Sequence, residues 1–160
     1  MSGGQTGVDR AALDIARELG IAAGGWCPQG RRAEDGRLQE RYPLKETPAA
    51  EYAQRTEWNI RDSDGTLVLT RGRATEGTAF SIEVARRLGK PCLVLDVAEN
   101  PDASQVGAWG RAHQVRVLNV AGPRESKCPG IYKHAYTFLR EVLAGPLNSE
   151  GEKSGGACPA

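Results

Sequence analysis

Apolar residues follow two patterns that alternate along the chain. Over residues 7–20, Val8, Ala12, Ile15 and Leu19 recur with the spacing of one helix face, and a glycine ends the pattern. Similar spacing or a helix-start signal predicts further helices at residues 47–61, 78–89, 102–113 and 130–143. Short apolar segments predict strands at residues 21–26, 65–70, 91–97 and 115–121.

This alternation predicts an α/β fold in which a mainly parallel sheet lies between two layers of helices. We expect one domain over residues 1–146, followed by a disordered tail over residues 147–160, which are rich in Gly, Ser, Glu and Lys. The SGGQTG turn at residues 2–7 should follow a strand, yet only Met1 precedes it. We therefore expect the first strand to be truncated.

Most of the unusual residues fall in loops that follow predicted strands. In open parallel sheets, ligands bind beyond the carboxyl ends of the strands. The loops expected at that edge are residues 1–7, 27–45, 70–77, 96–102 and 122–128. The positions of these residues in the sequence therefore agree with the ligand-binding edge of the predicted sheet.

Two glycine-containing turns open helices at this edge and suggest one shared anion or nucleotide site. Glycines let the backbone approach a ligand closely, and a helix N-terminus offers free N–H groups to an anion. The alternative is a pair of plain tight turns with capped helices. The candidate ligand residues in the two turns are Gly3, Gly4, Gln5, Thr6, Gly7, Asp9, Glu76, Gly77, Thr78 and Ser81.

Arginines in two other loops add positive charge to the candidate site. Arg31 and Arg32 follow a Cys-Pro-Gln-Gly turn, and Arg124 follows Gly122-Pro123. Guanidinium groups can clamp phosphate through two hydrogen bonds. Charged loops are also often simply solvated, so both interpretations stay open. We also consider Trp26 as a stacking platform for a planar ligand.

Other polar residues are interpreted more simply. Arg55 and Asn59, four positions apart, share one helix face, and Asp62 and Asp64 are expected to form a turn at the amino end of the next strand. The four cysteines are widely spaced without a CxxC pair, which favours free thiols in a reducing cytoplasm.

Composition narrows the class of protein. The 160 residues carry a formal net charge of +1, which argues against a dedicated nucleic-acid binder. No apolar run approaches the roughly 20 residues that span a bilayer, and no secretory signal opens the chain. We therefore expect a cytoplasmic protein with neither membrane nor nucleic-acid partners.

Several segments together resemble the molybdenum (molybdenum-cofactor) carrier family, a permuted branch of the SLOG superfamily. They are SGGQTGVDRAALDIA, GWCPQGRRAEDG, YPLKET, YAQRTEWNIRDSDGTLVL, EGTAFSIEVA, KPCLVLDV and LNVAGPRESKCPGIY. The resemblance covers residues 2–143. It implies a Rossmann-like three-layer fold, a homo-oligomer (dimer or tetramer) and binding of the molybdenum cofactor (molybdopterin) or a nucleotide-related ligand.

The same superfamily contains phosphoribohydrolases with a PGGxGTxxE signature, whose final Glu serves catalysis. Gly77-Thr78 matches the GT, but Ser81 stands where those enzymes have the Glu, and the paired glycines are replaced. Glu83 lies about 200° around the helix from Ser81. These departures count against hydrolysis, so we assign no catalytic residue. We also assign no metal ligand to the protein itself.

Three hypotheses remain at this stage. The first is a carrier that holds a phosphate-bearing pterin in the glycine-rich loops and passes it to molybdoenzymes. The second is a phosphoribohydrolase-like enzyme in which Asp9, Glu76 or Glu83 supplies a carboxylate. The third is a sensor of a nucleotide-derived signal that acts through contacts between subunits. Pterin, nucleotide and plain molybdate all offer anionic groups to the same donors, so the sequence does not choose between these ligands.

Overall fold

The computed structural model describes residues 1–145, and the expected tail at 147–160 lies outside these residues. The central sheet has three parallel strands in the order β6-β5-β7, namely Cys92–Asp96, Gly65–Thr70 and Leu118–Ala121. Every residue of β5 is buried, as expected of a strand in the middle of a covered parallel sheet. The α/β fold with a parallel sheet is therefore confirmed.

The chain's first residues extend this sheet beyond β7. Met1 bonds Leu118 and Val120 in the pattern of a parallel pair, with 3.0 Å from Val120 N to Met1 O. Ser2 N then donates to Gly24 O at 3.1 Å, next to β1 (Trp26–Cys27). β1 pairs in parallel with β4 (Lys45–Glu46). Two residues thus occupy the position of the strand that the sequence leads us to expect before the glycine-rich turn.

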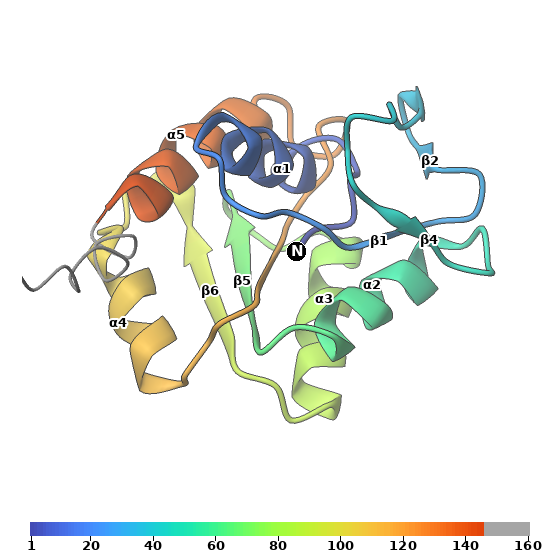
Figure 1. Cartoon of the computed structure of the whole chain (residues 1–160). Helices are drawn as coiled ribbons and strands as arrows, with labels where there is room; N and C mark the ends of the chain where they lie inside the picture. Colours follow the sequence, from blue (N-terminus) through green and yellow to red (C-terminus); the bar gives the residue numbers. More distant parts are fainter. Residues whose placement is uncertain (146–160) are drawn as a thin grey trace, which may run out of the picture.

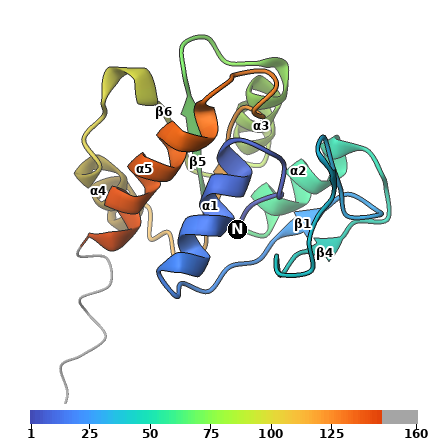
Figure 2. The ribbon, with the colours of Figure 1, turned by 90° about the horizontal axis from the view of Figure 1, so that it is seen from above.

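Helices cover both faces of the sheet (Figures 1 and 2). On one face, α1 (Val8–Glu18) lies beside α5 (Ile131–Ala144), and α4 (Ser104–Ala112) packs at the end of α5. The largest core cluster forms here, where Ile15, Leu67, Leu69, Val120 and Leu139 are buried together. This layer holds α1 rigidly against the end of β7.

The opposite face carries α2 (Tyr52–Arg61) and α3 (Glu76–Arg87), which contact each other. Ile60 of α2 packs with Val84 and Ala85 of α3 in a second, smaller core cluster. A short 3₁₀ helix, Val97–Glu99, follows β6. None of the helices within residues 1–145 is long and apolar enough to cross a bilayer.

The loop expected at residues 27–45 contains structure that periodicity does not reveal. A small antiparallel hairpin pairs β2 (Arg32–Ala33) with β3 (Gly36–Arg37). Leu38, Tyr42 and Leu44 form a separate buried cluster with Cys27 and Leu13. The segment is therefore a packed subdomain with its own small core.

The expected start of the second helix at Thr47-Pro48 is wrong, because α2 begins five residues later, at Tyr52. Thr47 Oγ1 donates to Ala49 O at 2.9 Å and to Cys27 O at 3.3 Å instead of capping a helix. Its backbone N–H also bonds Cys27 O at 2.8 Å. Thr47 therefore extends the pairing of β4 with β1.

Candidate functional site

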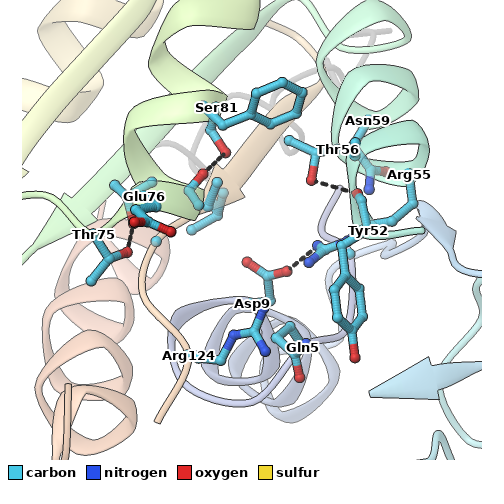
Figure 3. A pocket seen from close by; sticks show the side chains of 18 of the residues that line it. Gln5, Asp9, Tyr52, Arg55, Thr56, Asn59, Thr75, Glu76, Ser81 and Arg124 are labelled. Carbon is cyan, nitrogen blue, oxygen red and sulfur yellow. Dashed lines mark hydrogen bonds and ion pairs between the residues drawn. The ribbon is translucent and has the colours of Figure 1, made fainter. Parts of the chain in front are cut away.

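A cavity of about 510 Å³ lies at the carboxyl edge of the sheet, between the glycine-rich N-terminal turn, α2, α3 and the end of β7 (Figure 3). This volume is within the range of roughly 300–1,000 Å³ that small-molecule sites occupy. Its polar lining consists of Gln5, Asp9, Tyr52, Arg55, Thr56, Asn59, Thr75, Glu76, Thr78, Ser81, Asn119, Arg124 and Lys127. We call it the central pocket.

The N-terminus of α3 opens into one end of the central pocket. The side chain of its N-cap, Thr75, does not bond the helix backbone, because its hydroxyl lies 2.9 Å from the Thr78 hydroxyl. The first hydrogen bond of the helix runs from Ala79 N to Thr75 O at 2.8 Å. Glu76, Gly77 and Thr78 therefore present N–H groups that have no partner within residues 1–145. Such groups, together with the helix dipole, attract anions.

The loop after β7 covers part of the N-terminus of α1. Val8 N donates to Pro123 O at 3.2 Å. A Cβ on Gly7 would lie 2.3 Å from the same carbonyl oxygen, so only glycine fits at this contact. The sequence predicts that the two turns share one site, and residues of both turns line the central pocket, while the loop after β7 covers part of the start of α1.

An ion pair forms the floor of the central pocket. Arg55 Nη1 of α2 lies 2.6 Å from Asp9 Oδ2 of α1, and both side chains are largely buried. Gly3 makes room for it, because a Cβ there would lie 1.8 Å from Arg55 Nη1. Burial raises the pKa of the Asp9 carboxyl above its ordinary value, although Arg55 acts in the opposite direction.

Eight of the thirteen residues that the sequence suggests as ligand contacts line the central pocket. They are Gly3, Gln5, Asp9, Glu76, Gly77, Thr78, Ser81 and Arg124. The side chain of Gln5 is 5% exposed, and its Nε2 has no hydrogen-bond partner within residues 1–145. Ser81 Oγ donates to Gly77 O at 3.1 Å, so it serves the first turn of α3. The other five residues lie elsewhere.

Arg31 has a structural position that differs from the expected phosphate clamp. Its side chain is buried, and its guanidinium donates to the carbonyl oxygens of Leu38, Gln39, Tyr42 and Leu44 at 2.9 to 3.2 Å. All these donors hold the 38–44 segment in place. The Arg31 guanidinium therefore supplies hydrogen bonds that regular secondary structure would otherwise provide to this segment.

Gly4 and Thr6 support the turn without lining the central pocket. Gly4 has a φ of +77°, and a Cβ there would meet Leu44 at 2.7 Å and Leu38 at 2.8 Å. Thr6 Oγ1 donates to Glu34 and accepts from Glu125 N at 3.1 Å. Both residues attach the glycine-rich turn to neighbouring loops. Arg32 is exposed and lies beside Tyr52, outside the lining.

The surroundings of Trp26 do not favour the expected role of stacking on a planar ligand. Its indole N–H donates to Asp62 at 2.8 Å, and its ring packs edge-on against Trp58 with centroids 4.7 Å apart. Trp26 does not line the central pocket. Asp64, expected to form a turn, instead joins two distant segments, because its carboxylate accepts the backbone N–H groups of Arg116 and Val117.

Sequence reasoning did not assign Tyr52, Arg55, Thr56, Asn59 and Lys127 to the site, although all five line the central pocket. The shared helix face of Arg55 and Asn59 was visible as an i, i+4 pair. A polar face on an otherwise packed helix could have indicated a pocket wall. Tyr52 and Lys127 stand in no pattern that distinguishes them.

Cys27, Cys92 and Cys128 are free thiols, and burial raises the pKa of the first two. Within residues 1–145, no three His, Cys, Asp or Glu side chains are grouped as metal ligands.

Comparison with known proteins places this geometry in a family. The model of the circularly permuted YpsA SLOG family matches residues 1–143. A crystal structure from Syntrophus aciditrophicus SB, named "Putative molybdenum carrier protein", is 44% identical with a TM-score of 0.85. The similarity covers 89% of this chain and 92% of that one. A search of curated proteins gave no match.

Proposed function

The chain belongs to the circularly permuted YpsA SLOG family, and from this premise we propose that its central pocket binds a small phosphate-bearing molecule, the molybdenum cofactor. The observation that carries the proposal is the open N-terminus of α3. Three backbone N–H groups without partners in the described chain face a pocket that Arg124 and Lys127 also line. The name of the Syntrophus protein supports the choice of cofactor.

The chemistry of the molybdenum cofactor suits the residues present. Its phosphate can accept hydrogen bonds from the backbone N–H groups of Glu76, Gly77 and Thr78. The helix already fixes these donors, so no side chain has to be ordered when the phosphate binds. Gln5 Nε2, buried and without a partner in the described chain, provides one more donor close to the pocket. Enclosure of the pterin in the pocket would protect it from oxidation. We further propose that the carrier self-associates and delivers the cofactor to molybdoenzymes.

Gly77 offers a test that separates binding from folding. A Cβ at this position meets nothing within 4 Å, and an acidic residue in the first turn of a helix favours the helix dipole. Gly77→Asp should therefore fold normally, yet place a negative charge where the phosphate would bind. Gly77→Asn is the matched neutral control.

The test measures binding of purified molybdenum cofactor by isothermal titration and the rate of its oxidation. We expect wild type and Gly77→Asn to bind and protect it, while Gly77→Asp loses at least about tenfold in affinity, the size of one charged contact. Equal affinity of Asp and Asn variants would reject this anion site. Failure of the wild-type protein to bind the cofactor would reject the proposed ligand.

A second candidate is an enzyme that releases the base from a nucleotide. One observation favours it: two carboxylates, Asp9 and Glu76, line the same pocket as the open helix terminus. Pairs of carboxylates on either side of a glycosidic bond can act as acid and base. Incubation of the protein with a panel of nucleoside monophosphates tests this candidate, because release of free base that disappears in Glu76→Gln would support it. No release at high protein concentration would reject it.

A further inference from the structure

Three arginines from separate segments surround Tyr52, on the side of the central pocket away from α3: Arg55 and Arg124 line the pocket, and Arg32 lies just outside its lining. The guanidinium carbons of Arg32, Arg55 and Arg124 lie 5.2, 5.6 and 5.0 Å from the centre of the Tyr52 ring. They come from β2, α2 and the loop after β7. Figure 3 shows Tyr52 and Arg55 on one side, Thr75 and Glu76 on the other, and Arg124 between them, below Asp9.

The positive charge of this group is only partly balanced. Asp9 neutralises Arg55 at 2.6 Å. Glu34 lies 3.8 Å from Arg124, but its oxygens already accept from Thr6 and Ser126. Among the residues that the structure describes, Arg32 has no carboxylate within ion-pair distance. Arg32 and Arg124 therefore share the single negative charge of Glu34.

The donors of this group are also largely unused. Each guanidinium carries five N–H groups. Within residues 1–145, the only hydrogen bond from these three side chains runs from Arg55 Nη1 to Asp9, and Arg55 Nε is buried without a partner. The contrast with neighbouring Arg31, which makes four hydrogen bonds to carbonyl oxygens, is sharp.

Tyr52 itself is poorly suited to stack on a planar ligand, because guanidinium groups already lie around its ring. Its ring instead keeps the arginines together through cation–π contacts, which offset part of their mutual repulsion. A bound anion would remove the remaining repulsion and accept the unused hydrogen bonds.

We infer that Arg32 and Arg124, grouped around Tyr52, form a second anion subsite, so that the ligand carries anionic groups at both of its ends. This inference rests on the proposed function, because the first anionic group is the one held by α3. The ligand class is a small organic molecule with two separated anionic groups. A phosphate with an anionic metal–dithiolene centre and a nucleoside bisphosphate share this chemistry.

Adenosine 5′-monophosphate and adenosine 3′,5′-bisphosphate test the subsite on one scaffold, by isothermal titration against the full chain. We expect the wild type to bind the bisphosphate about tenfold more tightly, as one additional charged contact provides. The double variant Arg32→Gln/Arg124→Gln should lose this difference and bind the two nucleotides with equal affinity. Arg37→Gln is the control, because Arg37 is an exposed arginine on the adjacent strand that pairs with Glu40.

Equal affinity of the wild type for the two nucleotides, or an equal loss in Arg37→Gln, would overturn the second subsite. The molybdenum cofactor is titrated in parallel. A loss of about tenfold for the cofactor in the double variant assigns the second anion to its metal–dithiolene end. A loss for the bisphosphate alone assigns it to a phosphate.

The failure of the subsite differs from the failure of the proposed function. If the cofactor and the monophosphate bind but the arginine replacements change neither cofactor nor bisphosphate affinity, only the second subsite is rejected. If the wild type binds none of the three compounds, the proposed function is rejected together with the subsite. Circular dichroism of each variant checks that the arginine replacements leave the fold unchanged.

Discussion

Arg55 donates a 2.6 Å hydrogen bond to Asp9 across 46 positions of the sequence, and this pair connects α2 to the first turn of α1. The side chains are 12% and 5% exposed, so the pair is shielded from water. A buried ion pair adds little net stability, but the loss of one partner leaves an uncompensated charge. The pair therefore fixes the distance between the two helices that form the pocket floor.

The first prediction concerns this pair. Arg55→Met should lower the free energy of unfolding by about 3–5 kcal/mol, because Asp9 is left buried without its partner. Asp9→Asn should have a comparable effect, because the Arg55 guanidinium is then buried without its counter-charge. The double variant should be less destabilised than the sum of the two, as urea unfolding of all four proteins would show. Additive losses would mean that the two charges do not stabilise one another.

The second prediction separates two adjacent arginines. Arg31→Gln should lower the free energy of unfolding by about 2–4 kcal/mol, because several buried carbonyl groups lose charged donors together. Arg32→Gln should change it by less than about 0.5 kcal/mol, as is usual for an exposed side chain. Thermal and urea unfolding provide the measurement. Similar losses in both variants would contradict the structural role of Arg31.

The central strands could be predicted from sequence because apolar composition alone identifies a buried parallel strand. The prediction for residues 65–70 agrees with β5 at both ends, and 91–97 contains β6. Residues 115–121 contain β7, although the strand begins only at Leu118. Burial of β5 on both faces leaves a continuous apolar signal, which does not depend on distant contacts.

The candidate site was predictable only as a location. The glycine-rich turn and the start of α3 meet at the carboxyl edge of the sheet, as the topology requires. The sequence could not show that the Pro123 carbonyl accepts from Val8 N at the start of α1, because that contact joins residues 115 positions apart in the chain. Nor could it distinguish Arg31 from Arg32, since their burial depends on how the 38–44 segment folds back.

The third prediction concerns the glycine-rich turn. Gly4→Ala should cost more stability than Gly30→Ala, although the two glycines have φ values of +77° and +79°. Strain of the left-handed backbone, about 1–2 kcal/mol, is common to both. Only Gly4 adds a steric clash, with Leu38 and Leu44, whereas nothing lies within 4 Å at Gly30. Equal unfolding temperatures of the two variants would contradict this packing.

The last prediction concerns pH and the edge of the sheet at which β5 and β7 begin. Asp64 accepts the N–H groups of Val117 and Arg116 at 2.7 and 3.0 Å, and these bonds hold the pKa of its carboxyl below the ordinary value of 3.8. A carboxyl whose pKa is lower in the folded state stabilises the protein above its unfolded-state pKa. That stability is lost as pH falls through the folded-state pKa.

Asp64→Asn keeps an oxygen acceptor but removes the charge, so the variant should be less stable than the wild type at pH 7. Between pH 7 and pH 3, it should lose less stability than the wild type does, because one titrating group is gone. Urea unfolding at the two pH values measures both differences. The protection factors of the Val117 and Arg116 amides, corrected for the intrinsic pH dependence of exchange, should fall at low pH in the wild type, since protonated Asp64 is a weaker acceptor. An identical pH dependence of the two proteins would show that Asp64 does not couple the start of β5 to that of β7.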